Sequence, residues 1–401
     1  MPSSTRRRST WCGSRARTPA PSSPRPPPGS SGRWTRPSPT SRRRGCSRRR
    51  TCSATEAPIS GHWFRDSVSR AREPGLPLGV PRPGPRMNPF TVTMTAVGLA
   101  ALALAGDAFG QASTRPGVGA VPYSGTTSGV TFRTWAPNAS GVNVAGSFNG
   151  WNTTTHPLVA EGGGWWSRDI NGVTAGAQYK YVVRNGTQTL WKNDPRARRL
   201  VNSLGNSIVY SPTAYQWQTG PFAIAPWNEV VLYEMHPGTF NVLPGNQPPG
   251  TFAHAAQRLD HVRDLGINAI ALMPVNEFPG NLSWGYNPSY PYSVESAYGG
   301  PDALKAFIDA AHARGIAVLG DVVYNHWGPN DMDMWVFDGW SIPGRGGIFF
   351  YSDTRANTPW GDTRPDYGRG EVRSYIRDNA MMWLDEFRMD GLRFDATKFI
   401  R

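Results

Sequence analysis

The sequence has 401 residues, enough for two or three domains, and a formal net charge of +14. That charge is confined to residues 1–86, which contain 19 Arg, no Lys and three acidic residues and so carry +16, whereas the remainder sits near −2. Composition therefore excludes a basic surface for nucleic acid or membranes from the rest of the chain. All three cysteines lie in the first 86 residues, which excludes a disulfide framework and a cysteine metal site elsewhere: Cys12, Cys46 and Cys52.

Residues 1–86, here called the leader, are rich in Ser, Arg, Pro and Gly and show no apolar periodicity. Such a segment cannot bury enough surface to offset its chain entropy. We therefore expect a disordered leader, or translation of DNA upstream of the true start codon. The alternative is a basic arm that binds nucleic acid.

Residues 87–112 have the pattern of a signal peptide. Met87 opens a segment whose apolar run, from about Met94 to Ala105, is too short to span a bilayer and is followed by small residues. No Lys or Arg lies between Met87 and this run, so the basic n-region is weak, and the alternative is a buried apolar helix. We expect a secreted or periplasmic protein without stable membrane insertion, translated from Met87 or Met94.

Residues 118–215 consist of strand-like runs broken by Gly, Asn and Pro, such as VTFRTWAP, GVNVAGSF, GWWSRDI and QYKYVVRNG. This pattern predicts an immunoglobulin-like β-sandwich of about 100 residues. Its tryptophans are candidates for sugar stacking, the alternative being core packing: Trp135, Trp151, Trp165, Trp166 and Trp191. Residues 216–228 are interpreted as a linker.

From residue 229 onward, strand-like and helix-like segments alternate. The strand-like segments are VVLYEMHP, NAIALMPV, IAVLGDVVYNH and GLRFDA, and the helix-like ones are TFAHAAQRLDHVRDLG, PDALKAFIDAAHARG and EVRSYIRDNAMMWLDEF. Four strands and three helices predict an α/β domain over 229–401, an incomplete (β/α)8 TIM barrel covering about the first four strands. Because the sequence ends directly after the fourth strand, we expect a truncated product or part of a longer reading frame.

Functional groups of such barrels lie at the carboxyl ends of the strands. Asp321 and His326 close the third strand-like segment, and Arg393 and Asp395 lie on the fourth. Arg393 and Asp395 are two positions apart, so both side chains point to one face. A carboxylate beside a guanidinium stays ionised at neutral pH, as a nucleophile requires. The alternative is a structural Asp–Arg pair in the barrel core.

The motifs DVVYNH (321–326) and GLRFDATKF (391–399) occur in order on the third and fourth strands. With them, residues 229–401 resemble the α-amylase family of glycoside hydrolases and transglycosidases. YEMHPGTF, NHWGPND and TPWGD are similar to sequences of its branching-enzyme and malto-oligosyltrehalose trehalohydrolase branches. SFNGWN and KNDPRAR make residues 118–215 resemble the glycogen-binding-like module that precedes the barrel in those branches.

The resemblance implies a retaining double displacement. Asp395 matches the nucleophile, and Arg393 matches the arginine that keeps it ionised. A general acid with its carboxyl about 5 Å away protonates the leaving oxygen in such enzymes. In the family this acid is a Glu after the fifth strand, and a second Asp follows the seventh. These positions lie beyond the fourth strand, and no glutamate here matches, so we expect an inactive chain: Glu277, Glu371 and Glu386.

Further residues match positions that contact or support the substrate in the family. His326 would hydrogen-bond the sugar ring and Tyr286 would stack on it, Asp321 would support the site, and Lys398 would contact substrate. Phe399 stands where amylases often have His, which favours the other branches. The resemblance implies no required cofactor. Asn325 stands where many amylases have a calcium-linked asparagine, but not all branches share that role, so calcium stays open. The remaining histidines lack metal-ligand spacing and are interpreted as surface or helix-face residues: His156, His254, His261 and His312.

These observations lead us to expect a glycoside hydrolase or transglycosidase that acts on α-glucan or malto-oligosaccharide. Whether water or a sugar hydroxyl is the acceptor stays open. The alternative is a non-catalytic glucan-binding protein, in which the sandwich binds glucan and the half barrel is a remnant.

Overall fold

A computed structural model of the protein describes residues 110–245 and 247–400. The expectations for the leader and for nearly all of the signal-peptide segment lie outside these residues. All described residues fall in one compact unit.

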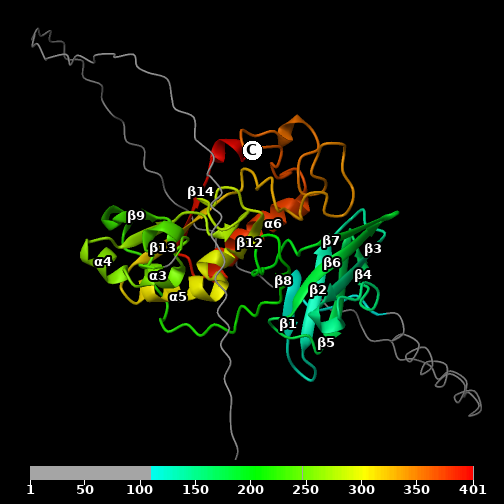
Figure 1. The fold of residues 1–401 in the computed structure, drawn as a ribbon, viewed down its shortest axis with the longest axis horizontal. Helices are drawn as coiled ribbons and strands as arrows, with labels where there is room; N and C mark the ends of the chain where they lie inside the picture. Colours follow the sequence, from blue (N-terminus) through cyan, green and yellow to red (C-terminus); the bar gives the residue numbers. More distant parts are fainter. Residues whose placement is uncertain (1–109, 246, 401) are drawn as a thin grey trace, which may run out of the picture. The chain divides into compact units, whose positions relative to one another are not determined.

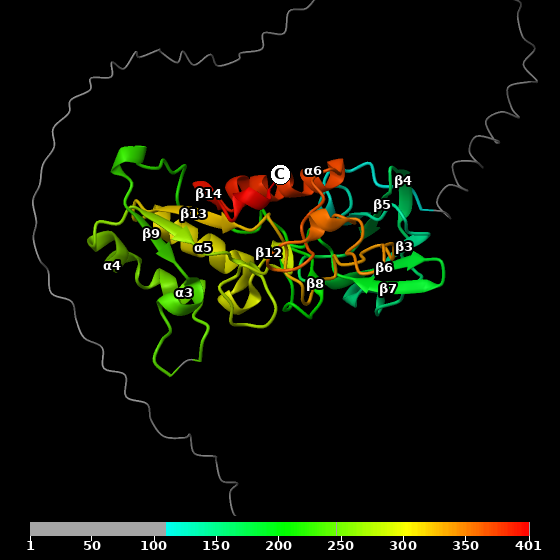
Figure 2. The same ribbon diagram turned by 90° about the horizontal axis from the view of Figure 1, so that it is seen from above.

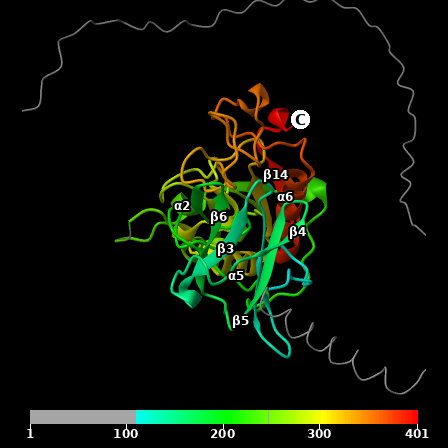
Figure 3. The ribbon, with the colours of Figure 1, turned by 90° about the vertical axis from the view of Figure 1, so that its right-hand side faces the viewer.

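Two antiparallel sheets form the predicted β-sandwich. One has the strand order β1-β2-β5-β4, and the other has the order β3-β6-β7 with β8 beside β6; Figure 3 shows β3 and β6 of one sheet beside β4 and β5 of the other. The strands are β1 (Gly119–Tyr123), β2 (Gly129–Trp135), β3 (Gly141–Gly146), β4 (Val159–Gly162), β5 (Trp165–Asn171), β6 (Gln178–Asn185), β7 (Gln188–Lys192) and β8 (Ser207–Ile208).

Alternation along the strands fills the sandwich core. Phe132 of β2 and Tyr179 of β6 are fully buried and meet edge to face, with ring centroids 5.1 Å apart. Burial of large aromatic rings from both sheets is what holds such a sandwich together. The prediction of a β-sandwich ahead of an α/β segment is confirmed.

A parallel sheet follows, with the strand order β14-β13-β10-β9. Its strands are β9 (Leu232–Met235), β10 (Ala269–Leu272), β13 (Ala317–Val322) and β14 (Gly391–Phe394). Helices α3 (Phe252–Ala256), α4 (Leu259–Asp264) and α5 (Gly300–His312) lie beside it (Figures 1 and 2). This order confirms the predicted partial barrel.

The apolar stripe of α5 explains how the helix packs on the sheet. Pro301 lies in its first turn, and Leu304, Phe307 and Ile308 are buried. The central strand β10 is buried between its neighbours. The edge strands are more open: Leu232 and Tyr233 of β9 are 51% and 37% exposed.

Two predicted helices differ from the structure. The stretch 251–266 forms α3 and α4 rather than one helix, because Arg258 leaves the helical region, at φ −109° and ψ 6°. The last helix changes its hydrogen-bonding pattern: α6 (Gly370–Met381) continues into a π-helical turn, η5 (Met382–Glu386), in which Phe387 N–H bonds Met382 O. Val372, Tyr375, Trp383 and Phe387 of this stretch are buried, and Ile376 is half-buried.

A short hairpin and several helical turns complete the described residues. The hairpin pairs β11 (Asn276–Glu277) with β12 (Tyr290–Val294). The turns are η1 (Ser147–Asn149), η2 (Trp227–Glu229), α2 (Pro237–Phe240), η3 (Ser296–Tyr298), η4 (Thr354–Ala356) and η6 (Thr397–Phe399). Between β13 and α6 runs a long irregular stretch, residues 323–369, here called the β13–α6 segment. No helix within the described ranges has the length and apolarity needed to cross a membrane.

Candidate functional site

The site begins with one register pair of the parallel sheet. Asp321 on β13 lies opposite Arg393 on β14. Arg393 Nη1 donates to both oxygens of Asp321, at 2.9 and 2.7 Å, and to Asp395 Oδ1 at 2.8 Å. One guanidinium nitrogen therefore bridges Asp321 on β13 and Asp395, which directly follows β14.

Asp395 is held at both carboxylate oxygens. Its Oδ2 accepts a hydrogen bond from Asn325 Nδ2 at 2.8 Å, and the same amide nitrogen reaches the Asp395 carbonyl at 3.0 Å. The backbone N–H of Asp395 donates to Val322 O. Its side chain keeps 16% exposure. The carboxylate is thus fixed in orientation and still reachable from solvent.

Tyr286 and Asp321 form the second layer of the site. The Tyr286 hydroxyl donates to Asp321 Oδ2 at 2.8 Å, and the Arg393 guanidinium lies 5.9 Å from the Tyr286 ring centroid. Burial raises the pKa of Asp321, although the hydrogen bonds from Arg393 and Tyr286 oppose that shift. For Arg393 burial lowers the pKa, but the bonds and charges of the two aspartates outweigh it and raise the pKa overall.

His326 is covered rather than open. Only 1% of it is exposed, and the Trp360 ring stacks on it at 4.7 Å and 18°. Burial lowers the pKa of His326 to about 4, so the ring is neutral at pH 7. Its Nδ1 lies against Asn325 Oδ1 and its Nε2 lies 3.3 Å from Asn287 Oδ1.

The tautomer of His326 follows from its neighbours. The Asn325 NH2 group is committed to Asp395, so Asn325 Oδ1 can only accept, and the proton sits on His326 Nδ1. His326 Nε2 must then accept, which requires the Asn287 amide to present its NH2 group there. His326 thus connects Asn325, and through it Asp395, to Asn287 in the loop between β11 and β12.

Lys398 lies at the rim of the site. It is exposed on η6, and its Nζ is 5.1 Å from the Phe399 ring centroid. Phe399 in turn meets Trp360 edge to face at 5.3 Å. Trp360 was missed as a site residue by sequence reasoning, and the only signal for it was the motif TPWGD. It is 41% exposed with one ring face on His326, so its other face is open.

Two polar residues that also follow strands lie in separate networks. His236, after β9, bonds Ser283 O and the Tyr298 hydroxyl. Glu277, after β10, is fully buried and accepts hydrogen bonds from the Ser296 N–H at 2.8 Å and the Ser296 hydroxyl at 3.1 Å. Burial and the charge of Glu295 raise the pKa of Glu277 to about 8.

The sandwich tryptophans divide into core and surface residues. Trp135 is 8% exposed, and Trp166 Nε1 donates to Ala136 O, so both serve packing. Trp151 and Trp191 pair at 6.3 Å, and Trp191 is 42% exposed. Only this pair fits the idea of a stacking surface.

His312, interpreted as a surface or helix-face residue, is the last residue of α5 and is buried. His312 is 7% exposed, its Nε2 lies 2.9 Å from Asp390 Oδ2, and its ring stacks on Phe222 at 4.3 Å. Asp390 precedes β14, so the partner that buries His312 comes from a distant strand. Among residues 110–245 and 247–400, no three His, Cys, Asp or Glu side chains are grouped as metal ligands would be.

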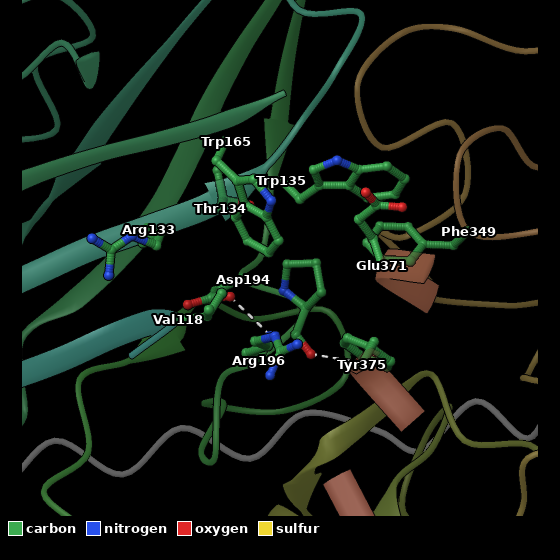
Figure 4. A pocket seen from close by; sticks show the side chains of 11 residues that line it. Val118, Arg133, Thr134, Trp135, Trp165, Asp194, Arg196, Phe349, Glu371 and Tyr375 are labelled. Carbon is green, nitrogen blue, oxygen red and sulfur yellow. Dashed lines mark hydrogen bonds between the residues drawn. The ribbon is translucent and has the colours of Figure 1, made fainter. Parts of the chain in front are cut away.

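A separate small crevice lies where the sandwich meets the barrel segment. Figure 4 shows Trp135, Phe349 and Tyr375 around it, with the Tyr375 hydroxyl donating to Pro195 O at 2.7 Å. Glu371 also lines it. None of the lining residues belongs to the Asp395 network, so the crevice is a junction between the two parts rather than the chemical site.

Comparison with protein families divides the chain as the fold does. Residues 118–197 match carbohydrate-binding module 48 (isoamylase N-terminal domain), and residues 198–336 match the alpha amylase catalytic domain.

Several characterised proteins are similar to the chain. The 1,4-alpha-glucan branching enzyme GlgB of Corynebacterium glutamicum is 36% identical over 287 residues, which cover 68% of this chain and 37% of that enzyme. The malto-oligosyltrehalose trehalohydrolase of Arthrobacter ramosus is 37% identical over 274 residues, covering 67% of this chain and 44% of that enzyme. The chain thus spans less than half the length of these relatives.

A solved structure agrees with the sequence matches. The crystal structure of a putative alpha amylase from Salmonella typhimurium superposes with a TM-score of 0.61 at 36% identity, over 72% of this chain and 45% of that one. The β-sandwich, the parallel sheet and the sequence matches all indicate the same family. The chain belongs to the α-amylase family, with a carbohydrate-binding module 48 followed by part of an α-amylase catalytic domain.

Proposed function

We propose that this protein acts on α-glucan by a retaining double displacement in which Asp395 is the nucleophile. The observation that carries the proposal is the fixing of both Asp395 oxygens, by Arg393 at 2.8 Å and by Asn325 at 2.8 Å. A carboxylate held by two donors keeps one orientation, and its remaining lone pairs can approach a sugar C1. In that step the Asp395–C1 bond forms while the glycosidic C1–O bond breaks.

The leaving oxygen of a glucan requires a proton from a second carboxyl group. Within the described residues, the carboxylate that shares Arg393 with Asp395 is Asp321, which already accepts three hydrogen bonds. Glu277 is bonded to Ser296, and Glu386 is paired with Arg198. We propose that none of these three carboxyl groups is the general acid.

A further part of the proposal concerns the acceptor, which decides between glucan transfer and hydrolysis. The relatives are named as a glucan branching enzyme and a trehalohydrolase. We infer an α-glucan or malto-oligosaccharide donor, with a sugar hydroxyl or water as acceptor. Tyr286 and Lys398 are the proposed substrate-binding residues. His326 is 1% exposed beneath Trp360 and both of its ring nitrogens face asparagine side chains, so we assign it a supporting role in the site.

A second candidate function is glucan binding by the sandwich alone. Trp151 holds a left-handed backbone, φ +61°, which is strained for a residue with a side chain. The hydrogen bond from the Gly146 N–H to Asn149 Oδ1, 2.9 Å, braces that turn. Strain that exposes an aromatic pair favours a stacking role for Trp151 and Trp191 over simple packing.

Two further proposals concern location and cofactors. We propose export to a secreted or periplasmic location, on the signal-like pattern of residues 87–112. We also propose that no cofactor is required for glucan binding, with calcium tested by measuring binding before and after chelation.

Labelling with α-maltosyl fluoride tests the nucleophile directly. Fluoride leaves without protonation, so the C1–F bond can break and the Asp395–C1 bond can form even where no general acid is present. We expect a maltosyl mass on the peptide that contains Asp395 and none in Asp395→Asn. A folded chain labelled nowhere, or labelled at another carboxylate, would overturn the assignment.

A further inference from the structure

The β13–α6 segment connects the sandwich to the candidate site. Its middle part lies beside strands β6 and β7 (Figure 2), and its later part carries Trp360 onto His326. We propose that the sandwich has a structural role in the site: by anchoring this segment through Asp333 and Asp338 it holds Trp360 against His326. Asp333 and Asp338 are then positioning residues.

Asp338 is the central anchor. It is fully buried, and its Oδ2 accepts hydrogen bonds from the backbone N–H of Asn138 at 2.9 Å and from the Asn138 side chain at 2.8 Å. Its other oxygen accepts from the Trp340 N–H at 3.1 Å, and its carbonyl accepts from Asn185 Nδ2 at 3.0 Å. Asp338 thus fixes the segment to the loop between β2 and β3 and to the end of β6 at once.

Asp333 and the backbone carbonyl of Trp335 form further contacts that anchor the segment on and beside β6 and β7. Asp333 Oδ2 accepts from the Asn193 N–H at 2.7 Å and lies 3.5 Å from Lys180 Nζ. Lys192 Nζ donates to Trp335 O at 2.8 Å. Each of these bonds joins residues more than 130 positions apart, so local chain folding cannot substitute for them.

Close backbone approach marks the same contact. Gly339 has φ +82°, and a Cβ added there would lie 2.8 Å from Asn185 Cβ. Gly344, on the same segment, has φ +78°, but a Cβ added there would meet nothing within 4 Å. Of these two positions, only Gly339 requires glycine both for its positive φ and for the close contact of the segment with the sandwich.

The anchored part is linked to Trp360 by hydrogen bonds within the segment. Val336 N–H donates to Gly346 O at 2.7 Å. The next residue back, Arg345, donates through Nη1 to Asn357 Oδ1 at 2.9 Å and Asp362 Oδ2 at 3.0 Å. These two acceptors flank Trp360 in sequence. The path from the sandwich to Trp360, and so to His326, is thus continuous.

Carbethoxylation of histidine with diethyl pyrocarbonate, read by mass spectrometry on the full chain, measures the coupling. His326 is shielded in the wild type because Trp360 covers it. We expect Gly339→Ala and Asp338→Ala to raise its modification rate by about tenfold or more, because the segment opens locally. His156, within the sandwich, serves as the internal reference and should react at an unchanged rate.

Matched variants separate docking from general destabilisation. Gly344→Ala imposes the same backbone strain without the clash, and Asp309→Ala removes a buried aspartate that binds the backbone N–H groups of Gln218 and Thr219 instead. Both should leave His326 protected. If Asp338→Ala does not fold, Gly339→Ala and the milder Asn138→Ala, which removes one side-chain bond, carry the test.

Protection of His326 in Gly339→Ala, or equal exposure in Gly339→Ala and Gly344→Ala, would overturn the proposal. The proposal rests on the proposed function only in naming the positioned site as a glucan site, and the labelling uses no glucan. Failure of α-maltosyl fluoride to label wild-type Asp395 would count against the function, while His326 exposure would still decide the positioning role.

Discussion

Arg393 and Asp321 face each other across adjacent parallel strands, and the guanidinium reaches both oxygens of the carboxylate at 2.9 and 2.7 Å. Asp321 is nearly buried, with 4% side-chain exposure, whereas Arg393 is half exposed. The main effect of the ion pair is therefore to offset the cost of burying the Asp321 carboxylate. It is not a pair of two surface charges.

Replacing Arg393 with Met should lower the free energy of unfolding by about 1–3 kcal/mol, because Asp321 loses its strongest donor and faces Asp395 without an intervening cation. Urea denaturation followed by circular dichroism measures this. Adding Asp321→Asn should restore part of the loss, since the repulsion disappears. Lys398→Met, which removes an exposed cation at the same rim, is the control, and an equal effect there would contradict the explanation.

His326 should make the protein less stable as pH falls. Its folded pKa, about 4, lies below the ordinary value of 6.5, so between these values the unfolded chain binds more protons. Stability is then fully present above pH 6.5 and is lost toward pH 4, with a slope of at most about 1.4 kcal/mol per pH unit. His326→Gln should flatten this limb of the urea-unfolding profile, and His261→Gln, at an exposed position, should not.

Glu277 should act with the opposite sign. Burial and the charge of Glu295 raise its folded pKa to about 8, above the ordinary 4.5, so the folded state binds more protons between those values. The contribution of Glu277 to the free energy of unfolding is fully present below pH 4.5 and is lost as the pH rises through 8. Glu277→Gln keeps the shape and should make the melting temperature fall less between pH 5 and 8. An unchanged profile, matching that of the exposed Glu229→Gln, would refute this.

Trp191→Ala should weaken binding of maltoheptaose to the sandwich by about two- to tenfold, the range that one aromatic contact supplies. Isothermal titration calorimetry gives the affinity, and the melting temperature should stay unchanged because Trp191 is 42% exposed. Trp227→Ala removes a tryptophan that is 81% exposed on η2 and serves as the matched control. Equal affinities in all three proteins would end the stacking proposal.

Sequence patterns predicted the parts of the fold that rest on local periodicity and strand order. The strand-like runs that form β2 and β6, the helix-like segment that forms α5 and the two-residue spacing of Arg393 and Asp395 each have a direct structural counterpart. The break at Arg258 was not predicted, because the apolar positions on both sides remain in phase with one helix.

Contacts between distant segments account for what sequence could not predict. His312 is a helix-face residue by position, but Asp390, 78 residues away, draws it into the interior. The covering of His326 depends on how the β13–α6 segment docks on the sandwich, and a Gly or Asp in an irregular stretch carries no such information by itself.

The polar contacts around Asp395 also set the order in which the molecule can assemble. Arg393 and Asp321 are 72 residues apart, and Asn325 and Asp395 are 70 apart. Each bond closes a long loop, so the chain must lose conformational entropy before the bond can contribute to stability. Hairpin pairs such as β6 and β7 close far shorter loops. We expect the sandwich to acquire native order early and the carboxylate cluster to form late in refolding, so that a partly folded chain has a complete sandwich and an unformed site.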